Sequence, residues 1–332
     1  MMKTFMEGEV FDAKDERTRL YGIGYKMKQY LWAVCLVFFL FLIAPPGWAG
    51  EEKSLSSTPI GDEKQEISFA ISAMISPEKT FSYYQDFLDY LSKKFGQRVV
   101  LKQRRTYQEV NDLLELGAVD YAFICTGAYL RAEQNFKLPV AAIPIIYGKD
   151  TYQSYIIVAK ESPIKTFDDL RGRIFAYTDD LSNTGALYPE YLIRKEGAIP
   201  EQFFSYFFYT HSHDKSIEAV ARGIADGAAV DSLVYDSLKE RNDLSVEKTR
   251  VILSSQPFGM PPVVVSPKTA KPFRERFQAI LFGMDQDPEG KKILKNLKID
   301  RFVEPSAGLY DSVREMENFL KASRKTSWLP DR

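Results

Sequence analysis

Short hydrophobic runs alternate with longer amphipathic runs along most of the chain, and this pattern predicts strands that alternate with helices. Strands are predicted at residues 67–71, 99–101, 121–124, 155–158, 174–177, 204–209, 227–230, 251–253 and 263–265. Helices are predicted at residues 77–95, 108–116 and 216–222, from Thr126 onward, and in a run that ends at Gly197. The alternation is typical of a mostly parallel sheet covered on both faces, and its restart near residue 155 indicates two α/β lobes.

The helix predicted at residues 77–95 has clear boundaries as well as a clear period. Ser76 and Pro77 suit the N-cap and the first helical position, and Gly96 is a stop signal. Its apolar residues recur at helical spacing, and they are Phe81, Tyr84, Phe87, Leu88, Leu91 and Phe95.

The segment between the strand at 174–177 and the next helix is rich in small polar residues. Ser182, Asn183, Thr184 and Gly185 lie where the first turn of that helix leaves backbone N–H groups unpaired. Side-chain donors beside these N–H groups predict an anion site that needs no Lys or Arg. An ordinary helix N-cap is the alternative interpretation of the same residues.

Several polar residues share one position in the predicted fold, directly after a strand. Thr126, Ser182, Asn183 and Asp231 all follow predicted strands. Ligands of open α/β sheets bind beyond the carboxyl ends of the strands, so these residues predict a single site between the lobes.

The N-terminal residues 1–49 are typical of an export signal. Basic residues precede the apolar run at 31–44, and small residues precede an expected cleavage point after Ala49. Translation from Met27 would by itself give a conventional signal peptide, and an uncleaved anchor is the alternative. Residues 50–65 are polar and aperiodic, which predicts a disordered leader.

Composition and charge exclude several classes of function. The formal net charge is −1 and no basic patch is interleaved with aromatic residues, so no nucleic-acid partner is expected. Export removes Cys35 and leaves Cys125 alone, so neither an internal disulfide nor a cysteine metal cluster can form. His211 and His213 lack a third ligand, and we expect no metal and no cofactor. A periplasmic phosphatase is disfavoured because the sequence contains no nucleophile elbow, zinc-protease motif or Walker loop.

An ordered set of motifs resembles the phosphonate/phosphite/phosphate family of periplasmic binding proteins of ABC transporters. The resemblance covers roughly residues 66–322. The matching segments are residues 117–123, 162–172, 182–185, 188–189, 219–221, 225–232 and 257–265, together with His213. It implies a type II periplasmic-binding fold, in which crossing strands join two lobes that close over a ligand.

The resemblance also implies domain boundaries, a function and partners. Lobe 1 is expected at residues 66–154 plus about 260–325, and lobe 2 at 155–259. The chain is expected to be a monomeric, non-enzymatic periplasmic solute-binding component of an importer. Its expected partners are a small phosphorus oxyanion (phosphonate, phosphite or phosphate) and an ABC permease with its ATPase.

The family's ligand-binding positions correspond to specific residues of this chain. The hydroxyl-rich loop that holds the anion oxygens corresponds to Ser182, Asn183 and Thr184, next to Gly185. The cleft tyrosines correspond to Tyr107 and Tyr152, for which core or surface packing is the alternative, and the cleft histidine corresponds to His213.

Two further residues at strand ends have two possible roles each. Thr126 is expected either to add a hydroxyl to the anion shell or to cap its helix. Asp231 is expected either to accept a hydrogen bond from a protonated P–OH group and repel fully ionised anions, or to cap the helix from Ser232.

The chain departs from family members that bind aminoalkyl phosphonates. Acidic residues that hold the amine in those proteins correspond here to Leu233 and the segment 260–262. This difference argues against an aminophosphonate and favours a smaller anion or one with an uncharged tail. Two alternatives remain: a sensor that feeds a membrane kinase or chemoreceptor, or a binding protein for another ligand such as a sulfonate, a thiamine precursor or a ferric-carbonate complex.

Overall fold

The structure is a computed structural model in which residues 66–326 are described. The predicted signal peptide and the predicted leader lie outside these residues. Within them, the strands form two separate sheets and one two-stranded ladder.

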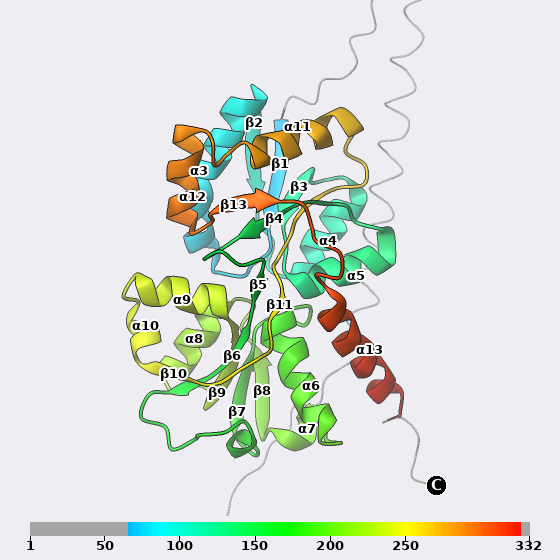
Figure 1. Ribbon diagram of the computed structural model, residues 1–332. Helices are drawn as coiled ribbons and strands as arrows, with labels where there is room; N and C mark the ends of the chain where they lie inside the picture. The colour runs from blue at the N-terminus through cyan, green and yellow to red at the C-terminus, as the bar shows by residue number, and fades with distance from the viewer. Residues whose placement is uncertain (1–65, 327–332) are drawn as a thin grey trace, which may run out of the picture. The chain divides into compact units, whose positions relative to one another are not determined.

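The first sheet has six strands in the order β13-β4-β12-β3-β1-β2 (Figure 1). The strands are β1 (Glu66–Ile71), β2 (Arg98–Lys102), β3 (Tyr121–Phe123), β4 (Val140–Ile145), β12 (Val263–Val265) and β13 (Arg301–Val303). The helices of this part are α3 (Pro77–Phe95), α4 (Tyr107–Leu116), α5 (Thr126–Phe136), α11 (Lys271–Phe282) and α12 (Pro288–Leu297). We call this sheet and its helices lobe 1.

The second sheet has five strands in the order β10-β6-β9-β7-β8. The strands are β6 (Ser154–Ala159), β7 (Ile174–Tyr177), β8 (Tyr206–Tyr209), β9 (Gly227–Asp231) and β10 (Thr249–Ser254). The helical segments are η1 (Asp168–Leu170), η2 (Asn183–Leu187), α6 (Tyr188–Lys195), α7 (Pro200–Phe203), α8 (His213–Ala221), α9 (Ser232–Glu240) and α10 (Leu244–Glu247). We call this sheet and its helices lobe 2.

Two short strands and one helix connect the lobes. β5 (Thr151–Tyr152) pairs antiparallel with β11 (Phe258–Gly259) where the chain passes between the two sheets. The last helix, α13 (Asp311–Thr326), forms ion pairs with both lobes, from Arg314 to Glu133 of α5 at 2.9 Å and from Arg324 to Glu190 of α6. The sequence-based assignment of residues up to about 325 to lobe 1 therefore stays a prediction for this helix.

The prediction of mostly parallel sheets is wrong, because both sheets are mixed. β1 pairs parallel with β2 and β3, and β7 pairs parallel with β8 and β9. The remaining ladders are antiparallel, including those that β12 forms with β3 and β4 after the chain has returned from lobe 2. β6 likewise runs antiparallel to β9 and β10.

Helix α3 begins and ends where the sequence predicts, and the left-handed conformation of Gly96 (φ 65°) terminates it. Only part of its periodic face is buried. Phe87, Leu88 and Leu91 pack in the core of lobe 1, whereas Phe81 is 55% exposed. Tyr84, in the same half of the helix as Phe81, packs against Phe123 of β3 with 5.7 Å between ring centroids, so the exposure is local to Phe81.

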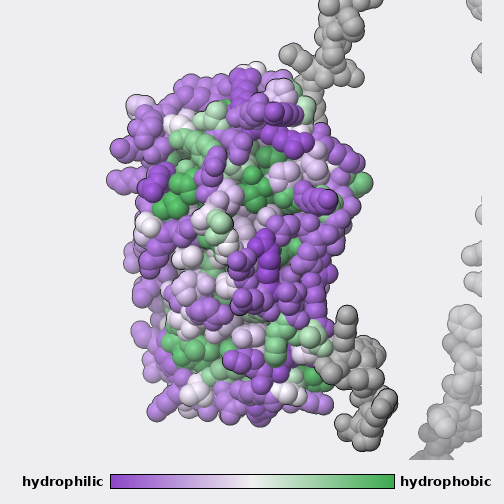
Figure 2. All heavy atoms as spheres, turned by 45° about the vertical axis from the view of Figure 1, so that its right-hand side comes forward, coloured by the Kyte–Doolittle hydropathy of each residue, from purple (hydrophilic) through white to green (hydrophobic). Residues whose placement is uncertain are grey.

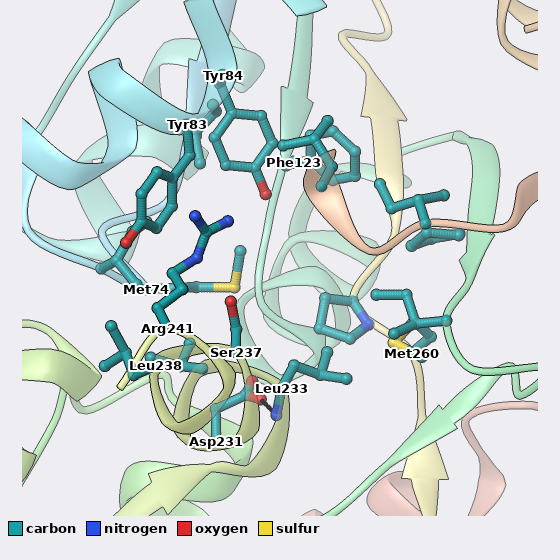
Figure 3. A pocket seen from close by; sticks show the side chains of 18 residues that line it. Met74, Tyr83, Tyr84, Phe123, Asp231, Leu233, Ser237, Leu238, Arg241 and Met260 are labelled. Carbon is teal, nitrogen blue, oxygen red and sulfur yellow. Dashed lines mark hydrogen bonds between the residues drawn. The ribbon is translucent and has the colours of Figure 1, made fainter. Parts of the chain in front are cut away.

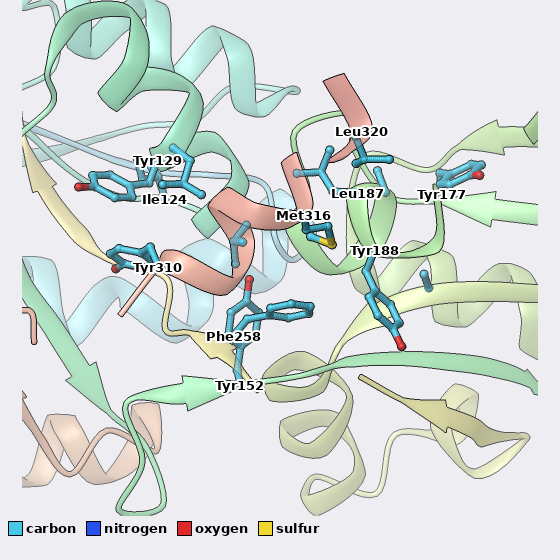
Figure 4. Packing of buried hydrophobic residues seen from close by; sticks show 14 of the residues in the cluster. Ile124, Tyr129, Tyr152, Tyr177, Leu187, Tyr188, Phe258, Tyr310, Met316 and Leu320 are labelled. Carbon is cyan, nitrogen blue, oxygen red and sulfur yellow. The ribbon is translucent and has the colours of Figure 1, made fainter. Parts of the chain in front are cut away.

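The hydrophobic core runs through the connection between the lobes (Figure 4). Tyr152 of β5 and Phe258 of β11 pack edge to face at 6.5 Å between ring centroids, and Tyr188 of α6 meets the same Phe258 at 5.8 Å. Tyr310, directly before α13, and Met316 of α13 extend this packing. Aromatic pairs at such distances add to the stabilisation from burial, so they stabilise the packing of β5 and β11 where the chain crosses between the lobes.

The surface of the described part is largely polar. On the face shown in Figure 2, hydrophilic residues cover most of the surface, with hydrophobic residues showing between them. None of the helices in residues 66–326 is both long enough and apolar enough to cross a membrane.

Candidate ligand-binding site

Six buried polar side-chain atoms that lack a hydrogen-bond partner belong to residues near the carboxyl ends of strands. They are Ser72 Oγ, Tyr107 Oη, Asn183 Oδ1, Thr184 Oγ1, His213 Nε2 and Asp231 Oδ2, and we call their residues the polar cluster. Buried polar groups are nearly always hydrogen-bonded in folded proteins, so such a cluster indicates a place for a polar ligand. Asn111, Tyr177 and His211 also have an unpartnered atom, and of these His211 and Tyr177 line two other pockets.

A π-helical turn presents the predicted anion loop. Ser182 caps η2 by accepting a hydrogen bond from the Gly185 N–H at 3.0 Å, which leaves the Ser182 hydroxyl hydrogen free to be donated. Thr184 is held through its carbonyl, which accepts from Ser154 Oγ at 2.7 Å, while its own hydroxyl has no partner. A Cβ on Gly185 would lie 2.5 Å from Thr178 Oγ1, so only glycine fits there. Gly185 therefore shapes the loop, and its N–H is engaged by Ser182.

The hydrogen bonds of His213 define its protonation state. His213 is the first residue of α8, and its Nδ1 accepts from the Asp231 backbone N–H at 3.1 Å. A neutral ring that accepts at Nδ1 carries its proton on Nε2. Burial lowers the pKa of His213 to about 3, so the ring is neutral at physiological pH. His213 thus offers an unpartnered Nε2–H donor.

The carboxylate of Asp231 has two differently engaged oxygens. Oδ1 accepts from the Leu233 N–H at 2.7 Å and caps α9, whereas Oδ2 is unpartnered. The capping role predicted from the sequence is confirmed, and it leaves one oxygen for a ligand. Burial raises the pKa of Asp231 to about 7, so both the acid and the carboxylate are accessible near neutral pH.

Both predicted cleft tyrosines are buried and lie at the boundary between the lobes. Tyr107 donates its backbone N–H to Asp179 Oδ2 of lobe 2 at 3.1 Å, and its hydroxyl is unpartnered. Burial first, and then the nearby Cys125, Asp179 and Asp231, raise the pKa of Tyr107 well above its ordinary value. The Tyr152 hydroxyl accepts from Asn183 Nδ2 at 3.1 Å.

Asn183 can present either end of its amide to the cluster. In the observed orientation Nδ2 donates to Tyr152, and Oδ1 is unpartnered. Rotation of the amide by a half turn would let the Tyr152 hydroxyl donate to Oδ1 and would turn Nδ2 towards the cluster. The residue is therefore suited to an anion as well as to a protonated oxygen.

The structure changes the predicted set of ligand-binding residues at two positions. The Thr126 hydroxyl donates to the Gly259 carbonyl at 2.8 Å, so its hydrogen is not available to an anion, and it ties α5 to β11. This geometry does not support Thr126 as a ligand contact. The alternative that Thr126 caps its helix is wrong, because Cys125 is the N-cap residue of α5. The sequence analysis does not predict Ser72, although it follows β1 directly and so carries a positional signal like that of Asp231 at the end of β9.

The polar cluster contains no Lys or Arg. Among the described residues, no group of three or more His, Cys, Asp or Glu side chains is arranged to hold a metal ion. Burial raises the pKa of the Cys125 thiol to about 11, which makes it a poor nucleophile. The arrangement suits recognition by hydrogen bonds rather than covalent or metal-assisted chemistry.

Comparison with known proteins identifies the family. The family described as "ABC transporter, phosphonate, periplasmic substrate-binding protein" matches residues 69–310. The chain belongs to this family. This binding protein is therefore a substrate-binding component of a phosphonate ABC transporter and not an enzyme, as the sequence predicts.

Individual relatives agree with this assignment. This binding protein is 28% identical over 218 residues to the phosphate-import protein PhnD of Mycolicibacterium smegmatis, a match covering 62% of this chain and 68% of that one. A binding protein component of an ABC phosphonate transporter from Pseudomonas aeruginosa matches with a TM-score of 0.74 at 22% identity, over 78% and 87% of the chains. PhnD1 of Prochlorococcus marinus in complex with methylphosphonate matches with a TM-score of 0.68 at 16% identity, over 77% and 98%. These two structural matches show the fold alone, and it is that of the type II periplasmic binding proteins.

Proposed function

We propose that the binding protein captures a small phosphorus oxyanion, of the phosphonate or phosphate class, at the polar cluster. The single observation that carries this proposal is the group of six buried polar atoms without a protein partner. A tetrahedral anion would supply acceptors for hydroxyl and imidazole donors and a partner for Asp231. Methylphosphonate in the complex of the Prochlorococcus marinus relative is an example of such a ligand.

The groups of the polar cluster come from both lobes. The donors Ser72 and Tyr107 belong to lobe 1, while the donors Thr184 and His213 and the carboxyl group of Asp231 belong to lobe 2. A ligand that contacts both lobes at once stabilises the closed state. Because all of the donors are neutral, release to the membrane permease does not require separating a buried ion pair. We propose that the closed form delivers the ligand to an ABC permease with its ATPase, after export directed by residues 1–49.

The Asp231 carboxyl favours phosphorus oxyanions over sulfonates. Asp231 Oδ2 and a ligand oxygen can form a hydrogen bond only if they share one proton. A phosphonate or phosphate can donate that proton from a P–OH group or can accept it from protonated Asp231. A sulfonate is fully ionised at neutral pH, so it can only accept.

The Thr184 hydroxyl offers the most direct test. Calorimetric titration of the wild-type chain with methylphosphonate, phosphite, phosphate and methanesulfonate should show binding of at least one phosphorus anion and weaker binding of the sulfonate. Thr184→Val removes one buried donor with little change of shape and should weaken that binding by about 1–3 kcal/mol, roughly fivefold to 150-fold.

Thr249→Val is the matched control, because Thr249 is a buried threonine of β10 whose hydroxyl bonds to Val246 and Tyr235 instead. It should change stability but not affinity. Wild-type affinity in Thr184→Val, or no binding of any phosphorus anion by the wild type, would disprove the proposed site.

A further inference from the structure

Two hollows of different chemistry open between the lobes. One is the apolar pocket of Figure 3, whose lining includes Tyr83 of lobe 1, Arg241 of lobe 2 and Asp231 at the end of β9. The other has a volume of about 550 Å³, and most of the residues that line it are polar or charged. We call it the basic groove, and the residues of its lining that matter here are Ser76, Arg104, Arg105, His211, Ser212 and Lys215.

The basic groove lies beside the polar cluster but shares no residue with it. Ser212 of the groove directly precedes His213 of the cluster. Arg105 of the groove comes two residues before Tyr107 of the cluster. An anion in the groove would therefore leave the cluster free for its own ligand.

Positive charge prevails in the groove. Arg104 and Arg105 follow β2 in lobe 1, and Lys215 lies in the first turn of α8 in lobe 2. Of these three, only Lys215 forms an ion pair within residues 66–326, with Glu218 at 2.9 Å. Glu78 is the one acidic residue among the described residues that line the groove. The groove is therefore suited to an anion.

Two buried serines and a histidine add polar groups to this charge. Ser76 and Ser212 are the N-cap residues of α3 and α8, yet neither side chain makes a capping hydrogen bond. They are only 5% and 4% exposed. An N-cap serine ordinarily accepts from a backbone N–H of its own helix, so both hydroxyls remain for another partner. His211 Nδ1 is buried and unpartnered as well.

Direct contacts hold the two helix N-termini side by side. Asp214 of α8 accepts from the Ser76 N–H at 2.9 Å, and the His213 N–H donates to the Met74 carbonyl at 2.9 Å. The carboxylate of Asp214 also lies 3.6 Å from Lys79 Nζ, which compensates its charge. The partial positive charges of both helix N-termini thus add to the cations of the groove.

The two lobes bring like charges to this groove. Arg105 belongs to lobe 1 and Lys215 to lobe 2, so closure brings their positive charges towards each other. An anion between them would replace this repulsion by two attractions. It would stabilise the closed state and, by reciprocal coupling, raise the affinity of the polar cluster for its ligand.

The size and the lining of the groove limit the kind of anion. A volume of about 550 Å³ falls among small-molecule sites, which span about 300–1,000 Å³. No Phe, Tyr or Trp is among the described residues that line it, so a nucleobase would find no ring of these types to stack on. We infer that the basic groove is a second anion site, which takes an inorganic oxyanion with two or more negative charges and favours closure when occupied. The effect on the cluster rests on the proposed function, whereas the groove site itself does not.

The test is calorimetric titration of the full chain with pyrophosphate, with and without saturating methylphosphonate. One pyrophosphate should bind per chain in both cases. Saturating pyrophosphate should in turn raise the affinity for methylphosphonate about fivefold. ADP should bind no more tightly than pyrophosphate, and tighter binding of ADP would overturn the assignment to an inorganic anion.

One variant in each lobe tests the groove. Arg105→Gln and Lys215→Gln should each weaken pyrophosphate binding about tenfold and abolish its effect on methylphosphonate. Thr184→Val, in the polar cluster, should leave pyrophosphate affinity unchanged. Arg301→Gln in β13 and Lys239→Gln in α9 are the matched controls, because both residues are exposed and lie outside the groove. They should leave both affinities unchanged.

The outcomes distinguish the inference from the proposed function. If pyrophosphate does not bind, competes with methylphosphonate, or is weakened by Thr184→Val and not by Arg105→Gln, the groove site is wrong. If Arg105→Gln weakens pyrophosphate binding and Lys215→Gln does not, the anion does not bridge the lobes and the inferred role in closure is wrong. If pyrophosphate responds to both groove variants while methylphosphonate, phosphite and phosphate do not bind at the cluster, the proposed function is wrong and the groove site stands.

Discussion

At the scale of single residues, the site is defined by two neighbouring groups with opposite pKa shifts. Burial lowers the pKa of His213 to about 3 and raises that of Asp231 to about 7. The cause is the same for both, because a buried environment favours the neutral form of either group. The ligand-free site can therefore exist near neutral pH without any charge.

The pKa of Asp231 predicts how stability depends on pH. Its carboxyl holds a proton up to about pH 7 in the folded protein but only to about pH 4 when unfolded. Its stabilising contribution is complete below pH 4 and is lost as the pH rises to 7. Relative to wild type, Asp231→Asn should therefore gain on the order of 3–4 kcal/mol in free energy of unfolding between pH 4 and 7. Urea unfolding of the ligand-free proteins at several pH values measures this difference.

His213 supplies an internal control of opposite sign. Its folded pKa lies below the unfolded value, so its contribution is lost as the pH falls from about 6.5 to 3. His213→Gln should become more stable relative to wild type as the pH falls through this range.

If the free energies of unfolding of wild type and Asp231→Asn differ by the same amount at every pH from 4 to 7, Asp231 has an ordinary pKa and the prediction is wrong.

The sequence predicts which residues follow strands better than it predicts what each hydroxyl contacts. Ser182 and Thr126 both follow strands, and the sequence predicts a ligand contact for both on that ground. Their roles differ because the Gly259 carbonyl, 133 residues away in sequence, accepts from Thr126. No local pattern contains that contact, and the same limit applies to the unpartnered hydroxyl of Ser72.

At the scale of elements, the C-terminal end of α9 connects lobe 2 to lobe 1. Glu240 forms an ion pair with Lys298 at 2.7 Å and accepts a hydrogen bond from the Tyr147 hydroxyl. The next residue, Arg241, donates to the Asn296 carbonyl at 3.3 Å and stacks over Tyr83 at 4.2 Å from the ring centroid. These contacts join the lobes beside the pocket, so they exist only in a closed arrangement.

Loss of the Glu240 contacts should weaken binding without touching the ligand. Glu240→Gln should lower the affinity for every phosphonate by the same factor, about twofold to fivefold, because it destabilises the closed state and exposed ion pairs are weak. Calorimetry with methyl- and butylphosphonate at low and high salt measures the factor, and high salt should shrink it.

Glu218→Gln is the control for this change. Glu218 pairs with Lys215 and Arg222 inside one lobe, so its loss should leave affinity unchanged. An effect of Glu240→Gln on one ligand only would contradict a role in closure.

The sequence also predicts the elements better than their directions. The strands at 67–71, 155–158 and 227–230 form close to the predicted positions. The error concerns the direction of strands such as β6, which is antiparallel to both neighbours, since a short buried apolar run looks the same in a parallel and an antiparallel ladder. The antiparallel pairing of β12 with β3 follows from the chain's return out of lobe 2, which is a property of topology rather than of local pattern.

At the scale of the whole described part, the proposed function makes ligand binding and closure one event. The polar cluster is complete only when Ser72 and Tyr107 of lobe 1 meet Thr184, His213 and Asp231 of lobe 2. A ligand bound by one lobe alone would form hydrogen bonds with only some of the polar cluster residues. The free energy of closure therefore comes from the contacts that the second lobe adds.

Removal of one lobe 1 donor should separate binding from closure. Tyr107→Phe keeps the buried ring and deletes only the unpartnered hydroxyl. It should weaken methylphosphonate binding about tenfold and, at saturating ligand, leave a larger radius of gyration in small-angle X-ray scattering than the liganded wild type has. Tyr121→Phe, which deletes a hydroxyl bonded to the Phe273 carbonyl inside lobe 1, should compact as wild type does. Equal compaction of Tyr107→Phe and wild type would mean that lobe 2 contacts alone determine closure, because the hydroxyl that lobe 1 brings to the ligand would then contribute nothing to it.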